Sequence, residues 1–99
     1  MKVNETDQRK ILAKLKYEDK SIKWLDTVDG MGFPMLTTTY KGKIYDVCVN
    51  YEDGNAIVYK LNKYGAGECK NMPFDFVARF IKGTITVMND MELRFQFKK

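Results

Sequence analysis

The chain has 99 residues, of which 44% are hydrophobic and 30% are charged, and its formal net charge is +4. This length suits one domain over residues 1–99, and an aromatic content of 13% is too high for a disordered chain. The absence of histidine excludes Ser–His–Asp and Cys–His catalysis and the commonest zinc ligand. We therefore expect no catalytic residue, no metal site and no cofactor.

The cysteine content and the N-terminal segment indicate a cellular compartment. Cys48 and Cys69 are too few for a disulfide-dependent secreted domain and form no CxxC pair. The segment from Met1 to Leu15 lacks an apolar stretch long enough for a signal peptide, and no apolar run is long enough to cross a membrane. These features predict free thiols in a cytoplasmic protein without a membrane partner.

The N-terminal segment has the pattern of an amphipathic helix over about residues 5–17. Asn4 and Thr6 are both candidate N-caps for it. Short helical structure is expected to restart at about residues 19–25, and the glycines and proline within residues 29–34 end it. The apolar residues of the first helix recur at helical spacing: Ile11, Leu12 and Leu15.

Two hairpins that share a strand are expected in the middle of the chain. Residues 35–40 and 43–50 alternate apolar and polar side chains on either side of a short turn at Lys41-Gly42. This turn sets Leu36 opposite Val47 and Thr38 opposite Tyr45.

The second hairpin is expected to turn at Glu52-Asp53-Gly54. A three-residue loop with a left-handed glycine pairs Val49 with Ile57, whereas a two-residue turn would set Val47 against Lys60. We expect the first register because a slip by one residue would expose the apolar set. It gathers six side chains on one face of the sheet as the core: Tyr45, Val47, Val49, Ile57, Tyr59 and Leu61.

A second helix is expected after a loop over residues 62–72. Asn71 and Pro73 are helix-start signals and Gly83 is a stop signal, which predicts a helix over residues 74–81. A strand is the rival interpretation of this segment.

The chain is expected to close with strands near residues 84–88 and 92–97. The predicted fold class is therefore α+β, an antiparallel sheet of about five strands with two helices, in the order α-β-β-β-α-β-β.

Three regions are candidate contact surfaces. The first is the basic N-terminal region, where Tyr17 and Trp24 are interleaved with lysines, a combination that suits single-stranded nucleic acid but also occurs on solvated helix faces. The second is the sheet face opposite the core, which is too apolar to be fully solvated and must be covered by a helix or a partner. Its expected residues are Met35, Thr37, Thr39, Ile44, Asp46, Cys48, Asn50, Ala56, Val58 and Lys60.

The third region is the segment over residues 30–35, which carries Met31 and Phe33. These side chains either tuck into the core or anchor a protein interface. Tyr64, in the loop over residues 64–68, is a weaker candidate contact residue of the same kind. Arginine occurs only at positions 9, 79 and 94, which weighs against sequence-specific nucleic-acid recognition.

These features favour a small non-catalytic interaction protein that binds and inhibits another macromolecule, of the kind that phages and mobile elements carry. The expected partner is a protein or a ribonucleoprotein. The alternatives are a nucleic-acid-binding module that uses the basic N-terminal helix and a histidine-free small enzyme that uses carboxylates with Tyr or Lys. A homodimer through the second sheet face or an edge strand is a further prediction. The predicted contact residues are Arg9, Lys10, Lys14, Lys16, Tyr17, Trp24, Met31, Phe33 and Tyr64.

Overall fold

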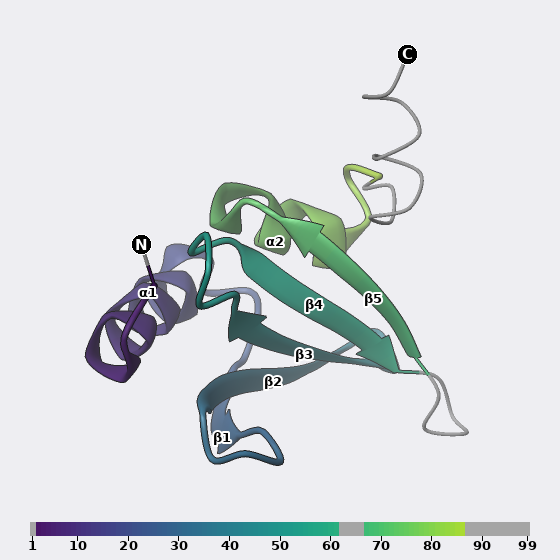
Figure 1. The fold of residues 1–99 in the computed structure, drawn as a ribbon. Helices are drawn as coiled ribbons and strands as arrows, with labels where there is room; N and C mark the ends of the chain where they lie inside the picture. The colour runs from purple at the N-terminus through teal and green to yellow at the C-terminus, as the bar shows by residue number, and fades with distance from the viewer. Residues whose placement is uncertain (1, 62–66, 87–99) are drawn as a thin grey trace.

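The computed structural model describes residues 2–61 and 67–86, which form two helices and one five-stranded antiparallel sheet (Figure 1). The strand order is β1-β2-β3-β4-β5, so each strand pairs with its neighbour in sequence. The predicted α+β fold class is confirmed. The elements are α1 (Glu5–Glu18), β1 (Leu25–Val28), β2 (Pro34–Tyr40), β3 (Lys43–Val49), β4 (Ala56–Leu61), β5 (Gly67–Met72) and α2 (Phe74–Lys82).

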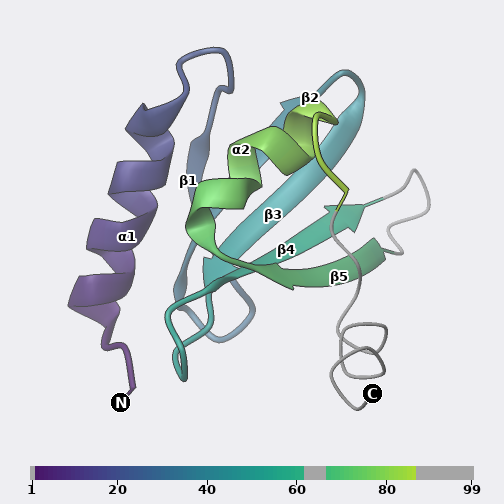
Figure 2. The same ribbon diagram turned by 90° about the horizontal axis from the view of Figure 1, so that it is seen from above.

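Both helices pack on the same face of the sheet. Seen from above, α2 lies over the strands and α1 runs along the side of β1 (Figure 2). Buried residues of the two helices and of alternate strand positions form one apolar cluster, so this face holds the core. The cluster contains Leu12, Leu15, Ile22, Trp24, Leu36, Tyr45, Val47, Val49, Ala56, Val58, Met72, Val77, Ala78 and Ile81.

Helix α1 begins where the sequence predicts. Asn4 is the N-cap, and its side-chain oxygen accepts a hydrogen bond of 2.8 Å from the backbone N–H of Asp7. The backbone N–H of Val3 donates to the carbonyl of Tyr51 at 2.6 Å. The start of α1 is therefore tied to the loop between β3 and β4.

Helix α2 confirms the predicted helix over residues 74–81, and the rival strand interpretation is wrong. It ends at Gly83, whose φ of 80° is left-handed and whose N–H donates to the carbonyl of Phe80. Lys82 in its last turn forms an ion pair with Asp19, which directly follows α1. Hydrogen bonds from Lys82 and Ser21 lower the pKa of Asp19 to about 2.

The register of β2 with β3 also matches the prediction. Lys41 and Gly42 have φ values of 50° and 80°, so both positions of the two-residue turn are left-handed, as a type I′ turn requires. Leu36 lies opposite Val47 as a result. Thr38 likewise pairs with Tyr45.

The predicted register of β3 with β4 is wrong by one residue. The backbone N–H of Asn50 donates to the carbonyl of Asn55, which leaves a four-residue loop in place of the expected three. Side chains support this loop: Asn50 accepts from the N–H of Glu52, and Asp53 accepts from that of Asn55. Val49 therefore pairs with Ala56.

Because of this shift, each apolar residue of β4 lies on the sheet face opposite to the one expected for it. Ala56 and Val58 are buried in the core, and Tyr45 pairs with Lys60. Ile57, Tyr59 and Leu61 lie on the other face. The expected six-residue core is thus wrong for half of its members, because only Tyr45, Val47 and Val49 belong to it.

Four further segments differ from the expectations or lie outside the described residues. The helical segment expected at residues 19–25 is a turn followed by β1, and part of the expected loop over residues 62–72 is strand β5. Residues 84–86 do not form a strand. Residues 87–88 and the strand expected at 92–97 lie outside the described residues.

Candidate functional site

The face of the sheet opposite the helices has no helix or strand packed on it in the part of the chain that the structure describes (Figure 1). The strand registers arrange its side chains in three rows that run across the sheet. We call this surface the open face. Its rows are Thr39, Ile44, Leu61 and Gly67; Leu25, Thr37, Asp46, Tyr59 and Cys69; and Thr27, Met35, Cys48, Ile57 and Asn71.

The open face exposes large apolar side chains. Tyr59 is 38% exposed at the centre of β4, and Ile44 and Leu25 are also exposed. Met31, at the tip of the β1–β2 hairpin, is 83% exposed and lies next to Phe33 in the same loop. Exposed apolar side chains gathered on one face of a sheet, with polar residues among them, are typical of an interaction surface.

A groove of about 560 Å³ lies at one end of the open face. The hairpin tip contributes Met31 and Phe33 to its wall, and the sheet contributes Cys48, Ile57 and Tyr59. The start of α1 and the β3–β4 loop close its other side. The groove is therefore formed by segments that are distant in sequence.

The carboxylate of Asp29 fixes the shape of the hairpin tip. Its Oδ1 accepts hydrogen bonds from the backbone N–H groups of Met31 at 2.8 Å and Phe33 at 2.9 Å. The backbone N–H of Asp29 also donates to the carbonyl of Phe33. This turn keeps both apolar side chains beside the groove although the loop contains Gly30 and Gly32.

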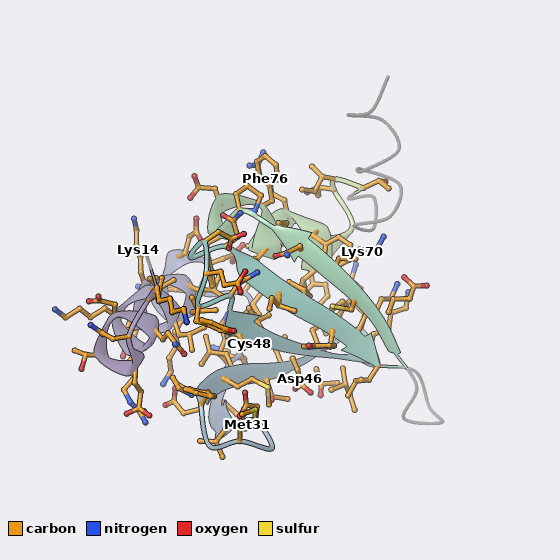
Figure 3. The ribbon with its side chains drawn as sticks, viewed as in Figure 1. Lys14, Met31, Asp46, Cys48, Lys70 and Phe76 are labelled. Carbon is orange, nitrogen blue, oxygen red and sulfur yellow. The ribbon has the colours of Figure 1, made fainter. Side chains whose placement is uncertain are left out.

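Asp46 lies in the middle row of the open face, on the central strand β3. Thr37 Oγ1 donates to its Oδ1 at 2.6 Å, and Thr27 Oγ1 lies 3.0 Å from Thr37 Oγ1. Asp46 takes part in none of the ion pairs among the described residues. In Figure 3 the side chains of Asp46, Cys48 and Met31 lie on the side of the sheet away from Phe76 of α2.

The charge pattern of the strands sets the open face apart from the rest of this basic chain. None of the open-face residues named above is Lys or Arg. The lysines of the described strands, Lys43, Lys60 and Lys70, occupy the alternate positions. Carboxylates are therefore the charged groups of the open face and its hairpin tip.

The pKa values of two open-face groups reflect burial and this negative field. Burial, followed by the charges of Asp29, Cys69 and Asp46, raises the pKa of the Cys48 thiol to about 11. Burial is also the main cause of the raised pKa of Tyr59. Both groups are therefore protonated and neutral at pH 7.

The structure does not bring the basic residues predicted on α1 into one cluster. Arg9 and Lys16 line a groove between α1 and β1; Arg9 pairs with Glu5 of α1 at 3.7 Å, and Lys16 pairs with Asp26 of β1 at 2.7 Å. Lys14 instead lines a groove between α1 and α2. Lys10 and Tyr17 are exposed on α1.

Trp24 was expected to be a contact residue, but it is only 8% exposed and belongs to the core. Its indole is packed among the core residues directly before β1, so its ring faces are not available for stacking. Met31 and Phe33 are the predicted contact residues that the structure places at the open face. Tyr64 lies outside the described residues.

Several open-face residues were missed by the sequence analysis. Ile57, Tyr59 and Leu61 replace the expected Ala56, Val58 and Lys60, because the register differs by one residue. Cys69 and Asn71 were missed with β5 itself. The asparagines on either side of the β3–β4 loop could have indicated the longer loop and hence the correct register, since asparagine side chains favour turns.

The described residues offer neither a metal site nor a membrane-spanning helix. No group of three Cys, Asp or Glu side chains there is placed to hold a metal ion. Neither α1 nor α2 combines the length and the apolar character that crossing a membrane requires. Comparison with protein-family models, with curated proteins and with solved structures finds no match to this chain.

Proposed function

We propose that this chain is a non-catalytic binding module that holds a partner protein on the open face of its sheet. The observation that carries the proposal is the one-sided packing of the sheet. Both described helices cover one face, while Tyr59, Ile44 and the hairpin tip expose apolar side chains on the other.

The chemistry of the open face supports a protein partner in preference to a nucleic acid. Nucleic-acid-binding surfaces combine aromatic side chains with Lys or Arg, because phosphates must be neutralised. Tyr59 has the aromatic component, but its neighbour across the strands is Asp46. A protein surface with an apolar centre fits these residues better.

The proposed effect on the partner is inhibition by occupation of one of its surfaces. The neutral Cys48 thiol and Tyr59 phenol are not activated nucleophiles, because their pKa values are raised and not lowered. A module of this kind acts through the area that it covers. The groove beside Met31 and Phe33 offers a place for a large apolar side chain of the partner.

The test compares capture by variants of the immobilised full chain. Tyr59→Ser combined with Ile44→Ser removes apolar area from the open face, and Tyr17→Ser removes a similar exposed ring from α1 as the matched control. Proteins and nucleic acids retained from a lysate of the native host are quantified by mass spectrometry and sequencing.

We expect at least one protein that the unmodified chain and the Tyr17→Ser variant retain equally. The open-face variant should retain it at least about 10-fold less, the effect of losing about 1.4 kcal/mol of binding free energy. Equal retention by all three forms would contradict the proposal. If the chain retains nucleic acid, and if Lys10→Ala and Lys14→Ala abolish that retention, the result would favour nucleic-acid binding by the basic helix instead.

A further inference from the structure

We propose that the partner presents a basic side chain, arginine or lysine set among apolar residues, to the carboxylate of Asp46 at the centre of the open face. This inference rests on the proposed function and specifies the chemistry of the bound surface. It follows from the position of Asp46, its hydrogen bonds and the charges around it.

Asp46 has the central position of the open face. It lies on the middle strand, with Thr37 beside it on β2 and Tyr59 beside it on β4. Ile44 and Cys48 are its neighbours along β3 on the same face. A surface that docks over these side chains must therefore cover the carboxylate as well.

The two oxygens of this carboxylate differ. Oδ1 accepts the hydrogen bond from Thr37, which fixes the orientation of the group. No described residue donates a hydrogen bond to Oδ2, and Asp46 has no ion-pair partner among the described residues. One oxygen is therefore held by Thr37, and the other has no hydrogen-bond donor among the described residues and can accept a hydrogen bond from a bound surface.

Covering an unpaired carboxylate is strongly unfavourable, because the charge loses its hydration. A purely apolar or acidic partner surface would carry that full penalty. A guanidinium or ammonium group offsets it through a charge-assisted hydrogen bond to Oδ2. Cross-strand neighbours have Cβ atoms roughly 5 Å apart, so a cation at Asp46 is also within reach of the Tyr59 ring.

The surroundings of Asp46 reinforce the same preference. The groove beside the open face is lined by the carboxylates of Asp29 and Glu5, and no basic residue occupies the rows of the open face. Lys2 is at the rim, where its ammonium lies 5.7 Å from the centre of the Tyr51 ring. In the next row, the buried Oδ1 of Asn71 has no hydrogen-bond partner among the described residues and is a further acceptor.

The experiment selects ligands from random sequences, so the partner need not be identified first. A random dodecapeptide phage library is panned against the full chain, against Asp46→Asn and against Asp75→Asn. The last variant makes the same chemical change at an exposed residue of α2 and is the matched control. Selected peptides are synthesised, and their affinities are measured by calorimetry.

We expect peptides selected on the unmodified chain to carry Arg or Lys next to a large apolar residue. Asp46→Asn should weaken them by about 30-fold or more, whereas Asp75→Asn should leave their affinity unchanged. Replacing the peptide's basic residue with Glu should restore binding to Asp46→Lys. This charge exchange keeps the test valid if one variant alone is poorly folded.

Peptides that lack a basic residue, or that bind Asp46→Asn as tightly as the unmodified chain, overturn the inference. If such peptides still lose their affinity in Tyr59→Ser, the open face binds protein and only the requirement for a cation is wrong. If Tyr59→Ser has no effect either, the proposed function fails as well.

Discussion

Two tyrosines on adjacent strands distinguish the observed register from the one expected from sequence. Tyr45 of β3 is 4% exposed, and its ring meets that of Phe80 of α2 edge to face at a centroid distance of 6.2 Å. Tyr59 of β4 is 38% exposed on the open face. In the register expected from sequence, both tyrosines would share the core.

The two identical substitutions Tyr45→Ala and Tyr59→Ala should therefore have unequal effects. A tyrosine buries roughly 200 Å², so the difference in exposure between 4% and 38% corresponds to roughly 70 Å². At about 25 cal/mol per Å², this area contributes about 1.7 kcal/mol. Loss of the ring contact with Phe80 adds about 0.5–1.5 kcal/mol for Tyr45 alone.

We expect Tyr45→Ala to lower the free energy of unfolding by about 3–5 kcal/mol, and by about 2–3 kcal/mol more than Tyr59→Ala does. Urea unfolding measures both values, with fluorescence of the single, buried Trp24 as the probe and circular dichroism as a second probe. Losses that agree within about 0.5 kcal/mol, or a larger loss for Tyr59, would refute the observed register.

The remaining predictions concern a buried hydrogen bond, a helix end and a thiol. Thr38→Val should lower the free energy of unfolding in urea by about 1–3 kcal/mol, because Thr38 Oγ1 donates a hydrogen bond to the carbonyl of Lys23 at 2.6 Å. A loss below about 0.5 kcal/mol would contradict this. Gly83→Ala should lower the free energy of unfolding, measured by thermal unfolding, by about 1–2 kcal/mol because the φ of Gly83 is +80°. Gly30→Ala is the control and should have little effect, because Gly30 has open space around it and no left-handed φ. Equal changes in the two variants would argue against the left-handed end of α2. Folding raises the pKa of Cys48 from 9.0 to about 11, so the protonated thiol favours the folded state. This contribution to the free energy of unfolding is complete below pH 9 and is lost as the pH rises toward 11. At pH 8 iodoacetamide should therefore modify Cys48 about 100-fold more slowly in the folded chain than in urea, as mass spectrometry would show, and equal rates would exclude the shift.

The contrast between the two central hairpins shows what turn residues determine. Lys41-Gly42 fits one two-residue turn, so the register of β2 with β3 could be predicted. The β3–β4 loop contains Gly54, which suits loops of more than one length. Side-chain hydrogen bonds of Asn50 and Asp53 decide in favour of four residues, and these are visible only in the structure.

Both edge strands were missed, for related reasons. In β1, Leu25 and Val28 are exposed, so the strand lacks the alternation that buried strands show. Strand β5 begins with Gly67, where a Cβ would lie 2.9 Å from the Leu61 side chain, and it contains few residues that favour strands. Pairing with the neighbouring strands determines both segments more than their own sequences do.

The candidate site was predicted only in part. Met31 and Phe33 stood out because apolar side chains on a glycine-containing loop are unusual. The role of Tyr59 depended on the β3–β4 register, and that of Asp46 on the neighbours that this register provides. Trp24 was misassigned because sequence proximity to lysines does not indicate whether a side chain is buried.

The accessibility of methyl groups to a soluble gadolinium chelate tests the open face most directly. We expect strong paramagnetic broadening of the NMR signals of Leu25 and Ile44, and little broadening of those of Leu36 and Val47, which are buried under the helices. If the methyl signals of Leu25 and Ile44 are protected as well as those of Leu36 and Val47, the face is covered in the free protein and the account is wrong.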